Sequence, residues 1–136
     1  MNPRFLADKS ALARANEPAV GNRLLPLLQE GLVATCAVVD LEVLYSARSP
    51  ADYKAVREER RAFPDVPITP AVMERALQVQ GLLARGGRHR VPIPDLIIAA
   101  AAESADLTVL HYDADYEQIA QVTGQKQQWV MPRGTL

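Results

Sequence analysis

The sequence predicts an α/β fold built on a central, mainly parallel sheet. Short apolar segments that suit strands alternate with longer helical segments along the whole chain. Such alternation is typical of a parallel sheet that helices cover on both faces. The chain has 136 residues, of which 49% are hydrophobic, enough for one core. No linker, repeat or low-complexity tract divides it, so we expect a single domain over residues 1–136.

The first half of the chain predicts two strands and four helices. The expected strands are 4–7 and 32–35, and the expected helices are 10–15, 20–30, 37–47 and 51–62. Gly31 provides a natural C-terminal stop for the helix before it. Opposite charges alternate in the last of these helices, so we expect Arg57, Arg60 and Arg61 to lie on a solvated face.

The second half continues the alternation. The expected strands are 66–68, 107–110 and 128–131, and the expected helices are 70–84, 95–104 and 115–122. Thr69 and Pro70 form an N-cap and first-turn pair. Glycines and a proline predict a loop over 85–93. The helix over 95–104 is apolar nearly all round, which indicates a central position.

Charge and cysteine content exclude several classes of protein. A net charge of -1 gives no general signal for nucleic acid, so any basic surface must be local. The single Cys36 excludes an internal disulfide and a thiolate zinc site, and its apolar neighbours favour burial. No apolar run reaches the roughly 18 residues of a membrane span, and the N-terminus does not suit a secretory signal. We therefore expect a cytoplasmic protein that does not enter the membrane.

Acidic residues are expected at one edge of the sheet or in buried positions. Asp8 and Asp113 directly follow strands, and Asp115 comes just after. Asp95 lies in the first turn of the apolar helix, and Glu42 lies within another apolar helix. Ligands gather beyond the carboxyl ends of parallel strands, and clustered carboxylates suit a hard cation such as Mg²⁺ or Mn²⁺. The pattern favours a metal-dependent acidic site.

Each acid also has a purely structural interpretation. Asp8, Asp95, Asp113 and Asp115 suit helix caps or turns. Glu42 could be solvated if its helix is rotated away from the core. Only the occurrence of these acids together favours the metal site, so residue patterns alone leave both interpretations open.

Four segments resemble the successive motifs of PIN-domain proteins. They are Leu6-Ala7-Asp8-Lys9-Ser10-Ala11, Val39-Asp40-Leu41-Glu42-Val43, Pro94-Asp95-Leu96-Ile97-Ile98-Ala99-Ala100 and Leu110-His111-Tyr112-Asp113-Ala114-Asp115-Tyr116. The resemblance spans essentially the whole chain and is strongest to the VapC-type toxins of bacterial toxin–antitoxin pairs. It implies an α/β/α sandwich, Mg²⁺ or Mn²⁺ at the acids, and endoribonuclease activity. It also implies a homodimer and a small VapB-like antitoxin that blocks the site.

The resemblance carries over to individual residues. Asp8, Glu42, Asp95 and Asp113 match the four acids of the PIN site. Under this resemblance Asp8 and Asp95 would bind the metal directly. Glu42 and Asp113 would complete the cluster, either through water or by orienting the attacking water.

Two further positions match with supporting roles, and one pair departs from the family. Ser10 matches a small hydroxyl residue that helps hold the metal site, and Asp115 matches an acid that precedes an aromatic residue. His111 and Tyr112 stand where many relatives carry Thr-Arg. Positive charge for RNA must then come from elsewhere. We expect Tyr112 to be the aromatic residue near the site.

A basic loop precedes Asp95 and is the candidate for RNA binding. Arg88 and Arg90 lie there and could hold phosphates, although a solvated loop explains them equally well. The leucines of the helix over 20–30 could exceed what the core needs and contact a partner or a second copy.

Two rival functions remain at this level. A phospho-accepting receiver domain also groups acids around Mg²⁺, but it normally has paired acids after the first strand. A PIN-like module could also bind RNA or a partner without cleavage.

Overall fold

The computed structural model describes residues 2–136 and contains four strands and seven helices over this range. The strands are β1 (Phe5–Ala7), β2 (Val33–Ala34), β3 (Thr108–His111) and β4 (Gln127–Trp129). The helices are α1 (Lys9–Leu12), α2 (Pro18–Gln29), α3 (Ala37–Tyr45), α4 (Pro50–Arg61), α5 (Pro70–Arg85), α6 (Ile93–Ser104) and α7 (Asp115–Thr123). The strand order is β2-β1-β3-β4, and every neighbouring pair is parallel. The predicted parallel α/β fold is confirmed.

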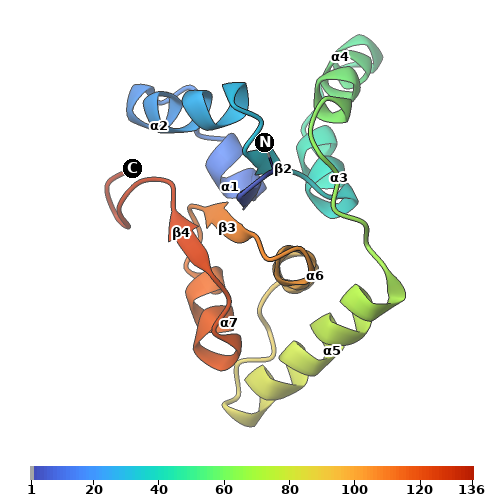
Figure 1. Ribbon diagram of the computed structural model, residues 1–136, viewed down its shortest axis with the longest axis vertical. Coiled ribbons are helices and arrows are strands. Elements are labelled where there is room, and N and C mark those ends of the chain that lie inside the picture. The colour runs from blue at the N-terminus through green and yellow to red at the C-terminus, as the bar shows by residue number, and fades with distance from the viewer. Residues whose placement is uncertain (1) are drawn as a thin grey trace.

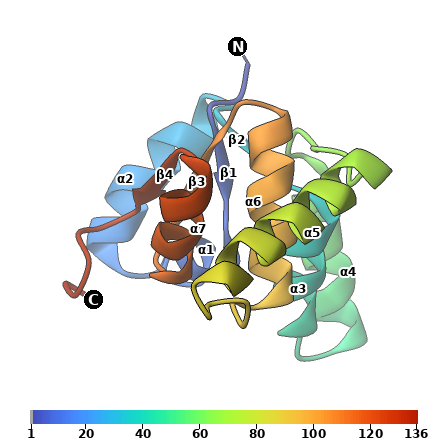
Figure 2. The same cartoon turned by 90° about the horizontal axis from the view of Figure 1, so that it is seen from below.

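Helices cover both faces of this sheet, so the molecule is a three-layer α/β/α sandwich (Figures 1 and 2). Successive strand residues face opposite layers. Leu6 and Val109 belong to a core built with α3, α5, α6 and α7. Phe5 and Leu110 pack on the other side with residues of α1 and α2. The alternation within two short strands therefore divides the core into two halves.

Helix α6 lies at the centre of the larger half, as its composition predicted. Its alanines at positions 99 to 102 are each at most 4% exposed. Small side chains allow a helix to approach its neighbours closely, and α6 contacts β3, α3, α5 and α7. Asp95, in the first turn, is thereby held against the sheet.

The expected strand over 66–68 is wrong. Asp65 forms only an isolated parallel bridge with Thr35, and the N–H of Val66 donates to the carbonyl oxygen of Thr35 at 2.8 Å. Pro67 follows and has no N–H to donate, so the ladder cannot extend. The other expected elements are present with ends shifted by a few residues.

Local end signals behave as the sequence predicted. The hydroxyl of Thr69 accepts a hydrogen bond from the N–H of Val72 at 3.2 Å and caps α5. Gly31 follows α2 with φ of 70°, a conformation that favours glycine. Cys36 is buried at the N-cap position of α3, and burial raises the pKa of its thiol. Within residues 2–136, no helix combines the length and the apolar character needed to cross a membrane.

Arg60 contradicts the expectation that the arginines of α4 lie on a solvated face. It is only 6% exposed. Its Nε donates to Oδ1 of Asp40 at 2.9 Å, and its Nη2 donates to the hydroxyl of Thr35 at 2.6 Å. Asp40 lies on α3, so the contact depends on tertiary packing that the local charge pattern does not encode. The network fixes α4 against α3 and the end of β2.

Replacing Asp40 by Ala should lower the free energy of unfolding by about 3–5 kcal/mol, because it leaves the guanidinium of Arg60 buried without its anion. Urea denaturation followed by circular dichroism measures this. The matched control is Arg61→Ala, which removes an exposed pair with Glu58 and should cost less than about 1 kcal/mol. Equal losses in both variants would contradict the assignment of Arg60 to the core.

Candidate metal centre

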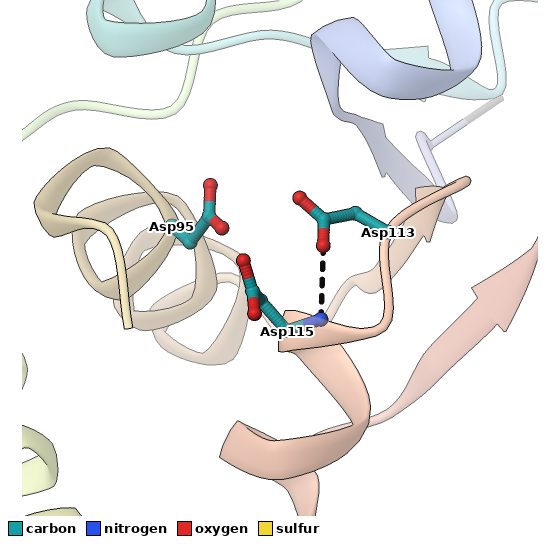
Figure 3. A group of neighbouring side chains, drawn as sticks. All are labelled: Asp95, Asp113 and Asp115. Carbon is teal, nitrogen blue, oxygen red and sulfur yellow. Dashed lines mark hydrogen bonds between the residues drawn. The ribbon is translucent and has the colours of Figure 1, made fainter. Parts of the chain in front are cut away.

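Five carboxylates from four separate segments meet at the carboxyl edge of the sheet. Side-chain oxygens of Asp95, Asp113 and Asp115 all lie within 4.8 Å of one another, and the three side chains point toward a common space (Figure 3). Asp8 joins them from the end of β1, since one tyrosine hydroxyl lies between Asp8 and Asp95. Glu42 approaches from α3, where the charges of Asp8 and Asp113 act on it. The structure thus brings together all the acids that the sequence singled out.

Asp8 is both a helix cap and a member of the cluster. Its Oδ2 accepts from the N–H of Ser10 at 3.0 Å and from the hydroxyl of Ser10 at 2.6 Å. The same hydroxyl oxygen accepts from the N–H of Tyr112 at 2.9 Å. This chain of bonds ties the turn after β1 to the turn after β3. The structural and functional interpretations of Asp8 are therefore compatible.

Asp113 is held by a short turn and by a histidine. Its Oδ1 accepts from the N–H of Asp115 at 2.9 Å (Figure 3), and its own N–H donates to Nδ1 of His111 at 3.0 Å. Because Nδ1 accepts, the ring hydrogen lies on Nε2 and points to Oε1 of Gln127 at 2.6 Å. Burial lowers the pKa of His111. A neutral imidazole thus supports the turn that presents Asp113, a role that the sequence did not reveal.

Two acids keep buried oxygens without a hydrogen-bond partner. Among residues 2–136, Oδ2 of Asp95 and Oε1 of Glu42 are in this state. Burial, together with the charge of Asp8 and the other acids, raises the pKa of Asp95 to about 8. Burial and the charge of Asp8 also raise the pKa of Glu42, and burial and Asp113 raise that of Asp115. The charge of Lys9 lowers the pKa of Glu42 but does not cancel the rise, so the repulsion among the acids is only partly compensated.

A divalent cation fits this set of side chains. The donors are all carboxylate oxygens, which hard cations such as Mg²⁺ and Mn²⁺ prefer. The unpartnered oxygen of Asp95 belongs to the group of three acids whose oxygens lie within 4.8 Å of one another. A cation there would pair the buried oxygen and offset the repulsion that raises the pKa values.

Tyr116, rather than Tyr112, is the aromatic residue at the acids. The Tyr116 hydroxyl donates to Oδ1 of Asp8 at 2.8 Å. Tyr112 instead packs its ring edge-on against Trp129, and its hydroxyl accepts from the N–H of Leu136 at 2.9 Å. The expectation for Tyr112 is therefore wrong. The motif placed Tyr116 directly after Asp115, and this adjacency is the signal that could have identified it.

The basic loop reaches the same edge of the molecule. A hollow of about 190 Å³ is lined by Arg88, Arg90, Val91, Asp115 and Gln118. Arg88 also donates a hydrogen bond to the side chain of Gln121 on α7. The two arginines that the sequence singled out thus lie beside one of the acids.

The chain is similar to known proteins over nearly its whole length. The PIN domain family model matches residues 5–122. Ribonuclease VapC21 of Mycobacterium tuberculosis is 47% identical over 137 residues, which cover 99% of each chain. Ribonuclease VapC51 of the same organism is 44% identical over 133 residues, which cover 98% of this chain and 97% of the relative.

Solved structures share the fold at low sequence identity. The crystal structure of DNA-bound VapBC from Salmonella typhimurium matches with a TM-score of 0.76 and 19% identity, over 95% of this chain and 99% of that one. The structure of VapBC-1 from nontypeable Haemophilus influenzae gives 0.75 and 16%, over 96% and 98%. These proteins therefore share the three-layer fold of this chain although their sequences differ at most positions.

Replacing Asp95 by Asn should make the stability of the metal-free protein less dependent on pH. The folded carboxyl has a pKa of about 8 against an ordinary 3.8, so it keeps a proton that the unfolded chain has released. Stability from this group is full below the unfolded pKa and is lost as pH rises toward about 8. Asparagine does not titrate. From about pH 5 to about pH 8, wild type should lose at least about 1.4 kcal/mol more than the variant, the equivalent of one pKa unit.

Urea denaturation in EDTA at both pH values measures this difference. Glu58→Gln, at an exposed acid of α4, is the control and should keep the wild-type pH dependence. Added Mn²⁺ should then raise the melting temperature of wild type and of the control, because it binds the native state, but not that of Asp95→Asn. Identical pH slopes in wild type and Asp95→Asn would refute the elevated pKa.

Proposed function

This chain belongs to the PIN-domain family, among its VapC ribonucleases, and we propose that it is an endoribonuclease that acts as the toxin of a toxin–antitoxin pair. The observation that carries this proposal is the meeting of five acids around Asp95 in a chain nearly half identical to named ribonucleases. Hydrolysis of a phosphodiester needs an activated water and stabilisation of negative charge on phosphorus. Clustered carboxylates with unpartnered oxygens suit both tasks when a cation is bound.

Asp8, Asp95 and Asp113 would hold a Mg²⁺ or Mn²⁺ ion, and Asp115 would add a further carboxylate beside Asp95. When bound, such an ion lowers the pKa of water and stabilises charge on a phosphoryl group. Ser10 supports this role by fixing Asp8 through two hydrogen bonds. The buried oxygen of Asp95 that has no partner among residues 2–136 supports it further.

Glu42 would accept the proton of the attacking water. Its pKa is raised by burial and by Asp8, which moves it toward the range of an effective general base. The water oxygen bonds to phosphorus, the bond to the leaving ribose oxygen breaks, one water proton passes to the Glu42 carboxylate, and the departing oxygen takes up a proton from solvent. Asp113, whose charge acts on Glu42, would help to orient that water.

Arg88 and Arg90 would hold the RNA backbone next to the acids. The hollow that they share with Asp115 supports this, since a phosphate bound there lies beside the reacting bond. Local positive charge is needed because the net charge of the chain is -1. Such binding through charge depends strongly on salt.

Protein partners would use exposed apolar surface. The expected surplus on α2 is limited, because Leu24 is buried and only Leu25 is largely exposed. A larger apolar groove lies between α5 and α6, where Met73, Leu77 and Ile93 are exposed. We propose that a small VapB-like antitoxin and a second copy of the chain bind to surfaces of this kind, and that the protein acts in the cytoplasm.

RNA cleavage by wild type should require both the metal and the acids. Asp8→Asn should lower kcat by at least about a hundredfold, because the loss of a metal ligand removes several kcal/mol of transition-state stabilisation. Cleavage of a labelled RNA, measured with Mn²⁺ and with EDTA, tests this. Glu58→Gln serves as the control and should cut at the wild-type rate. A wild type that binds RNA but never cleaves it would instead indicate a non-catalytic PIN module.

Replacing Arg88 and Arg90 together by Ala should weaken RNA binding and flatten its dependence on salt. The slope of log affinity against log salt should fall by about 2, roughly one for each arginine that no longer neutralises a phosphate. Fluorescence anisotropy over a salt series measures this. Arg61→Ala, on the exposed face of α4, is the matched control. An unchanged slope in the double variant would remove the loop from the RNA-binding surface.

A further inference from the structure

The hydroxyl of Tyr116 lies between two carboxylates of the site. Tyr116 is fully buried, at 0% exposure. Its hydroxyl oxygen is 2.8 Å from Oδ1 of Asp8 and 3.5 Å from Oδ1 of Asp95. A phenol has one hydrogen to donate, and the shorter distance assigns it to Asp8. Tyr116 is therefore bonded to one carboxylate and in contact with the next.

This bond completes the fixation of Asp8. Ser10 donates twice to Oδ2, and Tyr116 donates to Oδ1. Donors thus hold the carboxylate from both sides, and rotation about its side-chain bonds would break at least one of these bonds. Oδ1 can still accept a further contact, because each carboxylate oxygen offers about two acceptor positions and Oδ1 has one donor. Asp8 is oriented without being blocked.

The position of the hydroxyl is set by packing of the ring. Tyr116 lies in the first turn of α7 and belongs to the larger half of the core. Its ring centroid is 5.0 Å from that of His111, which in turn lies 5.0 Å from that of Trp129. Rings packed in this way move little, so the distance between the hydroxyl and the two acids is fixed by the fold.

We propose that Tyr116 is a positioning residue whose hydroxyl sets the orientation of Asp8 and its separation from Asp95, and so prepares the pair to bind a divalent cation. The inference rests on the proposed function, because it concerns the same acids. Without the hydroxyl, Oδ1 of Asp8 loses its donor and the carboxylate gains freedom to turn. A cation would then have to bind a less ordered pair of acids. Groups that orient metal ligands in this way typically change metal affinity by about 10- to 100-fold.

Tyr116→Phe tests this, because it keeps the packed ring and removes only the hydroxyl. Isothermal titration calorimetry with Mn²⁺, in the absence of RNA, should show affinity about 10- to 100-fold weaker than that of wild type. In RNA cleavage, kcat at a fixed low Mn²⁺ concentration should fall, KM for RNA should stay unchanged, and added Mn²⁺ should restore kcat. A purely structural role would not produce this recovery.

Tyr112→Phe is the matched control. Its hydroxyl accepts from the N–H of Leu136 and makes no hydrogen bond to an acid among residues 2–136. This variant should bind Mn²⁺ as wild type does. Thermal unfolding in EDTA should confirm that both variants are folded.

The outcomes separate this inference from the proposed function. If wild type binds and uses Mn²⁺ while Tyr116→Phe binds it with the same affinity, the positioning role is refuted and the ribonuclease proposal stands. If wild type binds no Mn²⁺, the metal site and the positioning role fall together. If Tyr112→Phe weakens Mn²⁺ binding as much as Tyr116→Phe does, the effect is not specific to the bond with Asp8, and the inference is overturned.

Discussion

Repulsion among buried carboxylates is the constraint that the rest of this structure must satisfy. Five acids meet at one edge of the sheet, and the pKa of Asp95 rises to about 8 as a result of burial and neighbouring charge. A local turn brings Asp113 and Asp115 together, but the other three acids lie far away in the sequence, so the tertiary fold must bring them to the same place. The parallel order β2-β1-β3-β4 places the ends of β1 and β3 side by side. The buried alanines of α6 let that helix bring Asp95 close to them.

On helix α3, one partly buried acid forms an ion pair and another has none among residues 2–136. Asp40 and Glu42 lie two residues apart and so face different sides of the helix. Asp40 is paired with the buried Arg60 at 2.9 Å, whereas Oε1 of Glu42 is buried with no partner among residues 2–136. The same helix therefore contains Asp40, which an arginine neutralises, and Glu42, whose buried oxygen could still interact with a cation. A fold that required only stability would gain from pairing both.

The sequence was sufficient to predict those features that depend on neighbouring residues. The cap at Thr69, the stop at Gly31 and the central helix α6 follow from local chemistry, and the acids could be identified because they follow strands or begin a helix. The sequence did not predict the roles of residues that act through contacts far away along the chain. Arg60 pairs across helices, and the hydroxyl of Tyr116 reaches Asp8 from the other end of the chain. His111 likewise supports Asp113 only because β4 supplies Gln127.

One acid of the site is held in place by hydrogen bonds, whereas two others have buried oxygens without partners in the described part of the chain. This difference explains how the site can be ordered and still be able to bind a cation. Neutral donors from Ser10 and Tyr116 hold Asp8 on both sides, so its orientation does not depend on a bound ion. Asp95 and Glu42 keep buried oxygens without partners among residues 2–136. A cation that binds beside Asp8 would pair the buried oxygen of Asp95 and would have to displace its proton. The arrangement that lowers the stability of the metal-free protein near neutral pH is thus the same one that favours binding of the metal.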